Sequence, residues 1–225
     1  MVFMEDSERA IELAKAFNLD LGLHLNLTQR MIKPPNKPLF SDYHEQLIRY
    51  LTAHKYNFLI YNPALRNQFE YVFRIQYEEF ERVYGAPPSH IDGHHHMHLC
   101  TNMLIGAVIP EGQKVRRNYS FSRGEKNFVN RMYRAIIDKS LRRRYITTDF
   151  LFSLLERLKI GRLAGALNLA RSSNVELQTH PEREEEFRWL VGQASVQAFF
   201  GLQKGNFSQL KRSACRGGNP KNEKD

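Results

Sequence analysis

The spacing of apolar residues along the chain changes between a period of two and a period near 3.6. From Leu21 to Leu27, four leucines alternate with smaller or polar residues, among them His24 and Asn26. Strict alternation is typical of a strand that buries one face. We therefore predict a strand here, with its leucines packed against covering helices and with His24 and Asn26 facing a polar interior.

Helical spacing recurs between the segments that alternate. Apolar stripes predict helices over residues 6–17, 43–54, 68–84, 128–141 and 149–169, and another that passes through Phe187 and Leu190. Further strands are predicted at residues 89–97, 114–121 and 175–180. Residues 28–41 contain three prolines and predict a loop that is either exposed or forms one wall of a cleft. This order of elements favours an α/β fold with a parallel sheet, in which functional residues gather at the carboxyl ends of the strands.

The predicted strand at residues 89–97 overlaps a dense cluster of histidines. Residues 90–98 read HIDGHHHMH and hold five of the nine histidines together with Asp92. Imidazole is the commonest metal ligand near neutral pH, so the cluster predicts a structured metal or catalytic site. A solvated histidine-rich loop and a set of core histidines are the alternatives. If the segment is extended as far as Met97, one of its faces holds His90, Asp92, His94 and His96, so at most some of the histidines bind one ion.

Three segments together carry a resemblance to a known family. They are GLHLNLT at residues 22–28, the histidine cluster at residues 90–98, and ELQTHP at residues 176–181. In order and spacing they resemble the YdjC-like carbohydrate deacetylases, the family of chitooligosaccharide deacetylase and the hopanoid-associated deacetylase. The resemblance runs from Met1 to about Leu210. It implies a distorted (β/α) barrel of the YdjC/NodB-like deacetylase type, a divalent metal, and hydrolysis of the N-acetyl group of an amino sugar or chitooligosaccharide.

The resemblance also implies roles for particular residues. His24 and His94 match the two metal-binding histidines of the family, and His180 matches the histidine that acts on the leaving group. The metal is then Mg²⁺ or Zn²⁺, since imidazoles favour zinc whereas carboxylates and waters permit magnesium. The partner is a small carbohydrate substrate, and a homodimer is possible. The barrel is predicted as a single domain over residues 1–210, followed by a basic, disordered tail at residues 211–225.

One departure from the family pattern concerns its acidic residues. Members of the family open with a strand that ends in Asp-Asp-Phe-Gly, whose aspartates resemble a general base and a third metal ligand. The seven aspartates of this chain are all isolated. We therefore expect the first strand and first helix of the barrel to be absent, and the activity of this form to be impaired. We favour a role for Asp92 in orienting a liganding imidazole, and the alternative is that it replaces the third ligand.

Composition limits the other classes of function. The chain has 225 residues, a net charge of +9, two cysteines and no apolar run long enough to span a membrane. The basic residues 142–144 and the tail could attract phosphates, but no nucleic-acid motif accompanies them, so no specific nucleic-acid partner is expected. A cytoplasmic location fits the apparent lack of a signal peptide. Two hypotheses remain, a metal-dependent carbohydrate deacetylase and a noncatalytic remnant of the same fold that binds a sugar or a metal.

Overall fold

A computed structural model describes residues 1–121, 124–125 and 127–212, so nearly all of the predicted tail lies outside the described residues. The strands are β1 (Leu23–Leu25), β2 (Ile91–Gly93), β3 (Phe150–Ser153) and β4 (Val175–Gln178). The longer helices are α1 (Ser7–Ala16), α2 (Pro38–Ala53), α3 (Arg66–Tyr84), α5 (Phe128–Arg144) and α8 (Glu184–Val191). The shorter helices are α4 (Thr101–Ile105), α6 (Leu154–Lys159), α7 (Leu163–Leu169) and α9 (Gln193–Ala198). None of the helices in the described ranges has the length and apolar character needed to cross a bilayer.

The strands form a row of short parallel segments. β1 pairs with β2, and β3 pairs with β4, both in parallel. Between these pairs, single parallel bridges join Ile91 to Val115 and Lys114 to Ile146. The fold is therefore mixed α/β with parallel strands, as the order of the predicted elements indicated. In the described part of the chain β1 and β4 are not paired, so the row is open.

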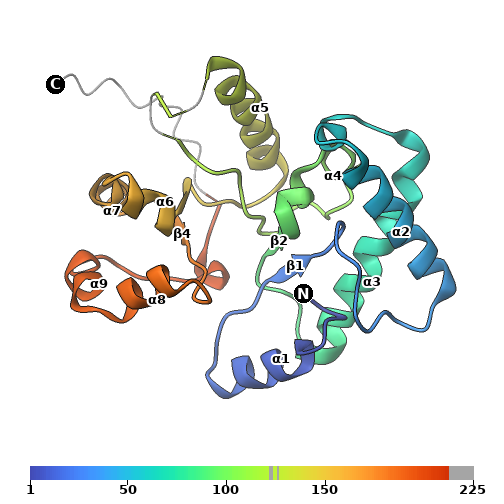
Figure 1. Cartoon of the computed structure of the whole chain (residues 1–225), viewed down its shortest axis with the longest axis horizontal. Coiled ribbons are helices and arrows are strands. Elements are labelled where there is room, and N and C mark those ends of the chain that lie inside the picture. Colours follow the sequence, from blue (N-terminus) through green and yellow to red (C-terminus); the bar gives the residue numbers. More distant parts are fainter. Residues whose placement is uncertain (122–123, 126, 213–225) are drawn as a thin grey trace.

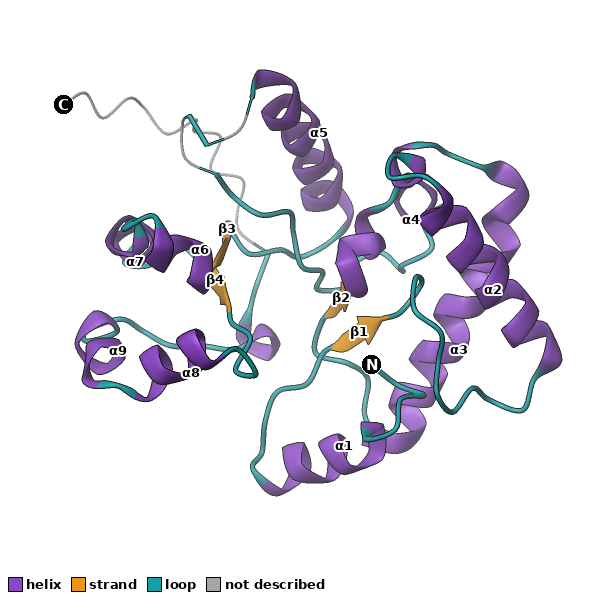
Figure 2. Ribbon diagram, in the orientation of Figure 1, coloured by secondary structure: helices purple, strands orange, loops and turns teal. Residues whose placement is uncertain are grey.

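The main core lies between β1, β2 and the helices α2 and α3. Figures 1 and 2 show these helices on one side of the two central strands, while α6 to α9 lie beside β3 and β4 on the other side of the molecule. Leu23, Leu25 and Leu27 are buried in this core, which confirms the prediction for the leucines of the first strand. Removing their side chains from water is the main force that fixes the strand against α2 and α3.

The predicted helix boundaries agree best with the structure where a glycine ends the helix. α3 covers the predicted segment 68–84 and stops at Gly85, whose φ of 83° is the left-handed conformation that glycine adopts without strain. α2 begins at Pro38, inside the predicted loop, because proline is well accommodated in the first turn of a helix.

Residues 149–169 and 114–121 do not have the secondary structure that the sequence predicts. Residues 149–169 do not form one helix but the strand β3 followed by α6 and α7. Leu151 and Phe152 are both buried, and such a short apolar run has no period that distinguishes a strand from a helix. The predicted strand at residues 114–121 makes only the bridges at Lys114 and Val115.

Asn26 is fully buried just after β1. Its Oδ1 accepts hydrogen bonds from the backbone N–H groups of Thr28 and Gln29, at 3.2 and 2.9 Å, and so turns the chain at the end of β1. Its own buried peptide groups bond to Gln76, whose Oε1 accepts from Asn26 N and whose Nε2 donates to Asn26 O, both at 2.8 Å. The amide of Gln76 thus replaces a neighbouring strand at this position.

Replacing Gln76 with leucine is expected to lower the free energy of unfolding by about 1–3 kcal/mol, because the substitution leaves a buried N–H group without a partner. Urea unfolding followed by circular dichroism measures the loss. The matched control is Glu78→Leu on the exposed side of the same helix, for which a change within about 0.5 kcal/mol is expected. Equal stability losses for the two variants would contradict a bonding role for Gln76.

Candidate active site

The register of β1 and β2 places His24 opposite Asp92. His24 Nδ1 lies 2.9 Å from Asp92 Oδ1, and the carboxylate is 8% exposed against 35% for the imidazole. Burial raises the pKa of Asp92, but the hydrogen bond with His24 and the positive charge of Arg116 outweigh it and hold that pKa well below its ordinary value. The ionised carboxylate therefore accepts Nδ1–H of His24 and leaves Nε2 of that ring as the nitrogen available to a ligand.

The extended segment that carries the histidines is shorter than predicted. β2 ends at Gly93, and residues from His94 to Leu99 form a short 3-10 segment. Two consecutive residues, His95 and His96, have φ values of 53° and 59°, in the left-handed region that side chains other than glycine adopt at a cost. A Cβ atom on Gly93 would lie 2.9 Å from the backbone nitrogen of His98, so this tight turn requires glycine at that position. The predicted alternation of side chains between two faces therefore ends at Gly93.

The turn brings the ring of His94 beside that of His24. The two ring centroids are 5.7 Å apart and the rings are nearly perpendicular. Because an imidazole nitrogen lies about 2 Å from a bound zinc ion, two rings that share an ion have centroids roughly 4.5 to 5.5 Å apart. The observed separation is slightly longer, so a small movement of either ring would let His24 and His94 share one ion.

The other histidines of the cluster have other surroundings. His90 stacks on Phe207 with centroids 3.8 Å apart, and burial lowers its pKa to about 4. Burial also lowers the pKa of His96 to about 4 and that of His98 to about 3. These three rings are neutral at pH 7. His98 is fully buried, whereas His90 and His96 are partly exposed, so among these three the alternative of a core histidine holds for His98. His95 instead lies beside Thr28, with its Nδ1 3.1 Å from Oγ1.

Two of the side chains predicted to bind a metal lie together in the described residues. No group of three or more histidine, cysteine or acidic side chains within residues 1–121, 124–125 and 127–212 is arranged to hold an ion. Catalytic metals are normally held by three protein ligands, so His24 and His94 alone fall one short. Asp92 contacts His24 and Arg116 and thus has the position of an orienting group rather than of a third ligand.

Arg116 connects this pair of strands to β4. Its guanidinium donates to Asp92 through Nη1 and to Glu176 Oε1 through Nε, the latter at 2.6 Å. All three side chains are largely buried. Burial raises the pKa of Glu176, and the charge of Arg116 opposes that rise. Sequence reasoning missed both Arg116 and Glu176, although a charged residue inside each predicted strand was an available signal.

His180 follows β4, the strand that carries Glu176. Its backbone N–H donates to Glu186 Oε2 at 2.8 Å, and its side chain is 30% exposed. In the described part of the chain no hydrogen bond or ring contact joins His180 to His24 or His94. The structure thus places His24, His94 and Asp92 together, and connects them to the strand before His180 through Arg116 and Glu176.

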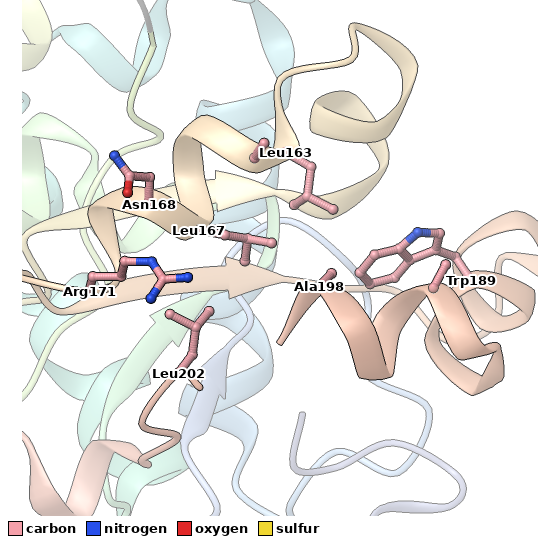
Figure 3. Close-up of a pocket in the computed structure, with 9 residues that line it drawn as sticks. Leu163, Leu167, Asn168, Arg171, Trp189, Ala198 and Leu202 are labelled. Carbon is pink, nitrogen blue, oxygen red and sulfur yellow. The ribbon is translucent and has the colours of Figure 1, made fainter. Parts of the chain in front are cut away.

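A separate cavity of about 470 Å³ lies between α7, α8 and α9 (Figure 3). Its walls are mostly apolar, with Trp189 at one end and Arg171 at the other (Figure 3). The residues that line it include no carboxylate and no imidazole. It therefore lacks the acid and base groups that the cluster around His24 provides.

The protein is thus a mixed α/β protein in which β1 and the turn after β2 bring two imidazoles side by side, one of them bonded to a buried carboxylate. The chain belongs to the YdjC-like protein family, whose model matches residues 1–204. It is also similar to a carbohydrate deacetylase of Clostridium beijerinckii, with 28% identity over 192 residues. That match covers 80% of this chain and 67% of the relative. The family expected from the three sequence motifs is therefore confirmed.

Proposed function

We propose that this protein is a metal-dependent carbohydrate deacetylase that removes the acetyl group from an N-acetylated amino sugar or chitooligosaccharide. Family membership and the similarity to a carbohydrate deacetylase support this function. The observation that carries it is the adjacent pair of His24 and His94, with His24 oriented by Asp92. We further propose that the row of parallel segments belongs to a distorted (β/α) barrel.

In this proposal each residue has a defined task. His24 and His94 hold a divalent ion, Mg²⁺ or Zn²⁺, and Asp92 keeps the His24 ring in the tautomer whose Nε2 is free. When bound, such an ion polarises an amide carbonyl and makes water a stronger nucleophile. His180 donates a proton to the amine that leaves when the C–N bond breaks. Arg116 holds Asp92 in its ionised form.

The activity of the 225-residue chain alone is expected to be low. The sequence has no adjacent aspartates, and the described residues provide only two candidate ligands. Loss of a general base typically lowers a rate by about 10²-fold to 10⁴-fold. The alternative of a noncatalytic protein rests on the same observation, and in that case the site binds a sugar or an ion without turnover.

Release of labelled acetate from N-acetylated chitooligosaccharides tests the proposal directly. The chain is incubated with Zn²⁺ or Mg²⁺ beside the Clostridium beijerinckii relative as a positive control. We expect slow acetate release, about 10²-fold to 10⁴-fold below that of the relative, which stops on addition of a chelator and in a His180→Ala variant. The matched control is His54→Ala, because His54 is an exposed histidine at the carboxyl end of α2.

Three other outcomes of this experiment would change the conclusion. Sugar binding without acetate release would favour the noncatalytic alternative, and neither binding nor release would contradict both hypotheses. Chelator-sensitive turnover as fast as that of the relative would contradict the argument that a catalytic base is lacking.

A further inference from the structure

The ring of His180 faces a buried carboxylate. Nδ1 of His180 lies 3.6 Å from Oε1 of Glu186, and the Glu186 side chain is 0% exposed. The other oxygen of the same carboxylate, Oε2, accepts the backbone N–H of His180 at 2.8 Å. Glu186 is thus fixed to the backbone of the residue whose ring it faces.

Both facing atoms lack another hydrogen-bond partner. Nδ1 of His180 and Oε1 of Glu186 are buried and form no hydrogen bond with the described residues. Buried polar atoms are normally paired, and catalytic hydrogen bonds are often long before substrate binds. A small rotation of the ring would close the gap, which makes the two atoms the natural partners of each other.

Glu186 lies in the first turn of a helix. It is the third residue of α8, close to the partial positive charge of the helix N-terminus. Arg183 also approaches this carboxylate, with Nη1 3.6 Å from Oε1 of Glu186, but its side chain is 49% exposed. Its cation is therefore well solvated, and it leaves Oε1 available to the His180 ring.

We propose that Glu186 is a positioning residue for His180: it accepts Nδ1–H of the ring and so directs Nε2 toward the substrate. The catalytic role of this contact rests on the proposed function. In the reaction, the Nε2–H bond of the protonated ring breaks as an N–H bond forms on the leaving amine. The ring becomes neutral and keeps its remaining proton on Nδ1, where the carboxylate of Glu186 holds it.

The tautomer of the His180 ring tests the proposal without any need for turnover. Nitrogen-15 NMR distinguishes Nδ1–H from Nε2–H at about pH 9, where an ordinary histidine ring with a pKa of about 6.5 is neutral. We expect Nδ1–H in the unaltered protein and a shift toward Nε2–H in Glu186→Ala. The control is Glu185→Gln, at the exposed neighbouring carboxylate that is 3.7 Å from Lys159. An Nε2–H ring in the unaltered protein would overturn the proposal even if Glu186→Ala failed to fold.

Turnover separates this inference from the proposed function. Glu186→Gln keeps the shape of the side chain and is expected to lower kcat by about 10-fold to 10²-fold with KM unchanged, while Glu186→Asp restores part of the loss. An Nδ1–H ring in a protein that never releases acetate would refute the deacetylase function and leave the pairing in place. Measurable turnover that is unchanged in Glu186→Gln would refute the positioning role.

Discussion

An Arg116→Met variant is expected to lose about 3–5 kcal/mol of its free energy of unfolding, because it leaves buried carboxylates without their cation. Asp92 and Glu176 both bond to Arg116, and their side chains are 8% and 10% exposed. Methionine has a similar length but no charge, so the loss reports on electrostatics more than on volume. Urea unfolding without added metal, followed by circular dichroism, measures it.

A matched surface arginine provides the control. Arg74 forms an ion pair with Glu78 at 3.0 Å, but its side chain is 56% exposed. Arg74→Met is expected to cost about 0.3–0.5 kcal/mol, as exposed pairs four residues apart on a helix usually do. Addition of Glu176→Gln to Arg116→Met should recover part of the loss, since one uncompensated charge is removed. A loss below about 1 kcal/mol for Arg116→Met would refute the role of this arginine as the link between the two pairs of strands.

Substitution of either candidate ligand is expected to weaken Zn²⁺ binding by at least about 10²-fold, because the remaining imidazole alone holds the ion poorly. The variants are His24→Ala and His94→Ala, and equilibrium dialysis against a competing chelator measures the affinity. Asp92→Asn should have a smaller effect, about 10-fold to 10²-fold, because it alters only the orientation and basicity of His24. This measurement does not depend on turnover.

His54→Ala is again the control, since this exposed histidine lies at the end of α2. Its Zn²⁺ affinity should equal that of the unaltered protein. Unchanged affinity in His94→Ala would remove His94 from the site, and unchanged affinity in Asp92→Asn would show that its contact with His24 does not tune a ligand.

The sequence was most informative where a short pattern has one structural solution. Alternation over residues 21–27 predicted β1 and its buried leucines, and Gly85 marked the end of α3. The three histidine motifs were sufficient for the family, which the match over residues 1–204 confirms. The pattern was ambiguous where an apolar run was short, so β3 was taken for helix.

Pairs of residues that are distant in the sequence could not be found from it. The partners of Arg116 lie 24 and 60 residues away, and even the contact of Glu186 with His180, six residues apart, depends on how the chain turns between β4 and α8. The sharp turn after Gly93, with two residues in the left-handed region, ends the expected alternation and places His98 in the core.

The sequence by itself determined the class of fold, the family and the residue types available for chemistry, because these depend on local periodicity and on motif spacing. The motifs had already singled out His24, His94 and Asp92, but only the tertiary structure showed that Arg116 balances Asp92 and Glu176 and that Glu186 faces the ring of His180. The physical reason is that a hydrogen bond or an ion pair depends on distances of a few ångströms between atoms, and the packing of helices against the sheet sets those distances.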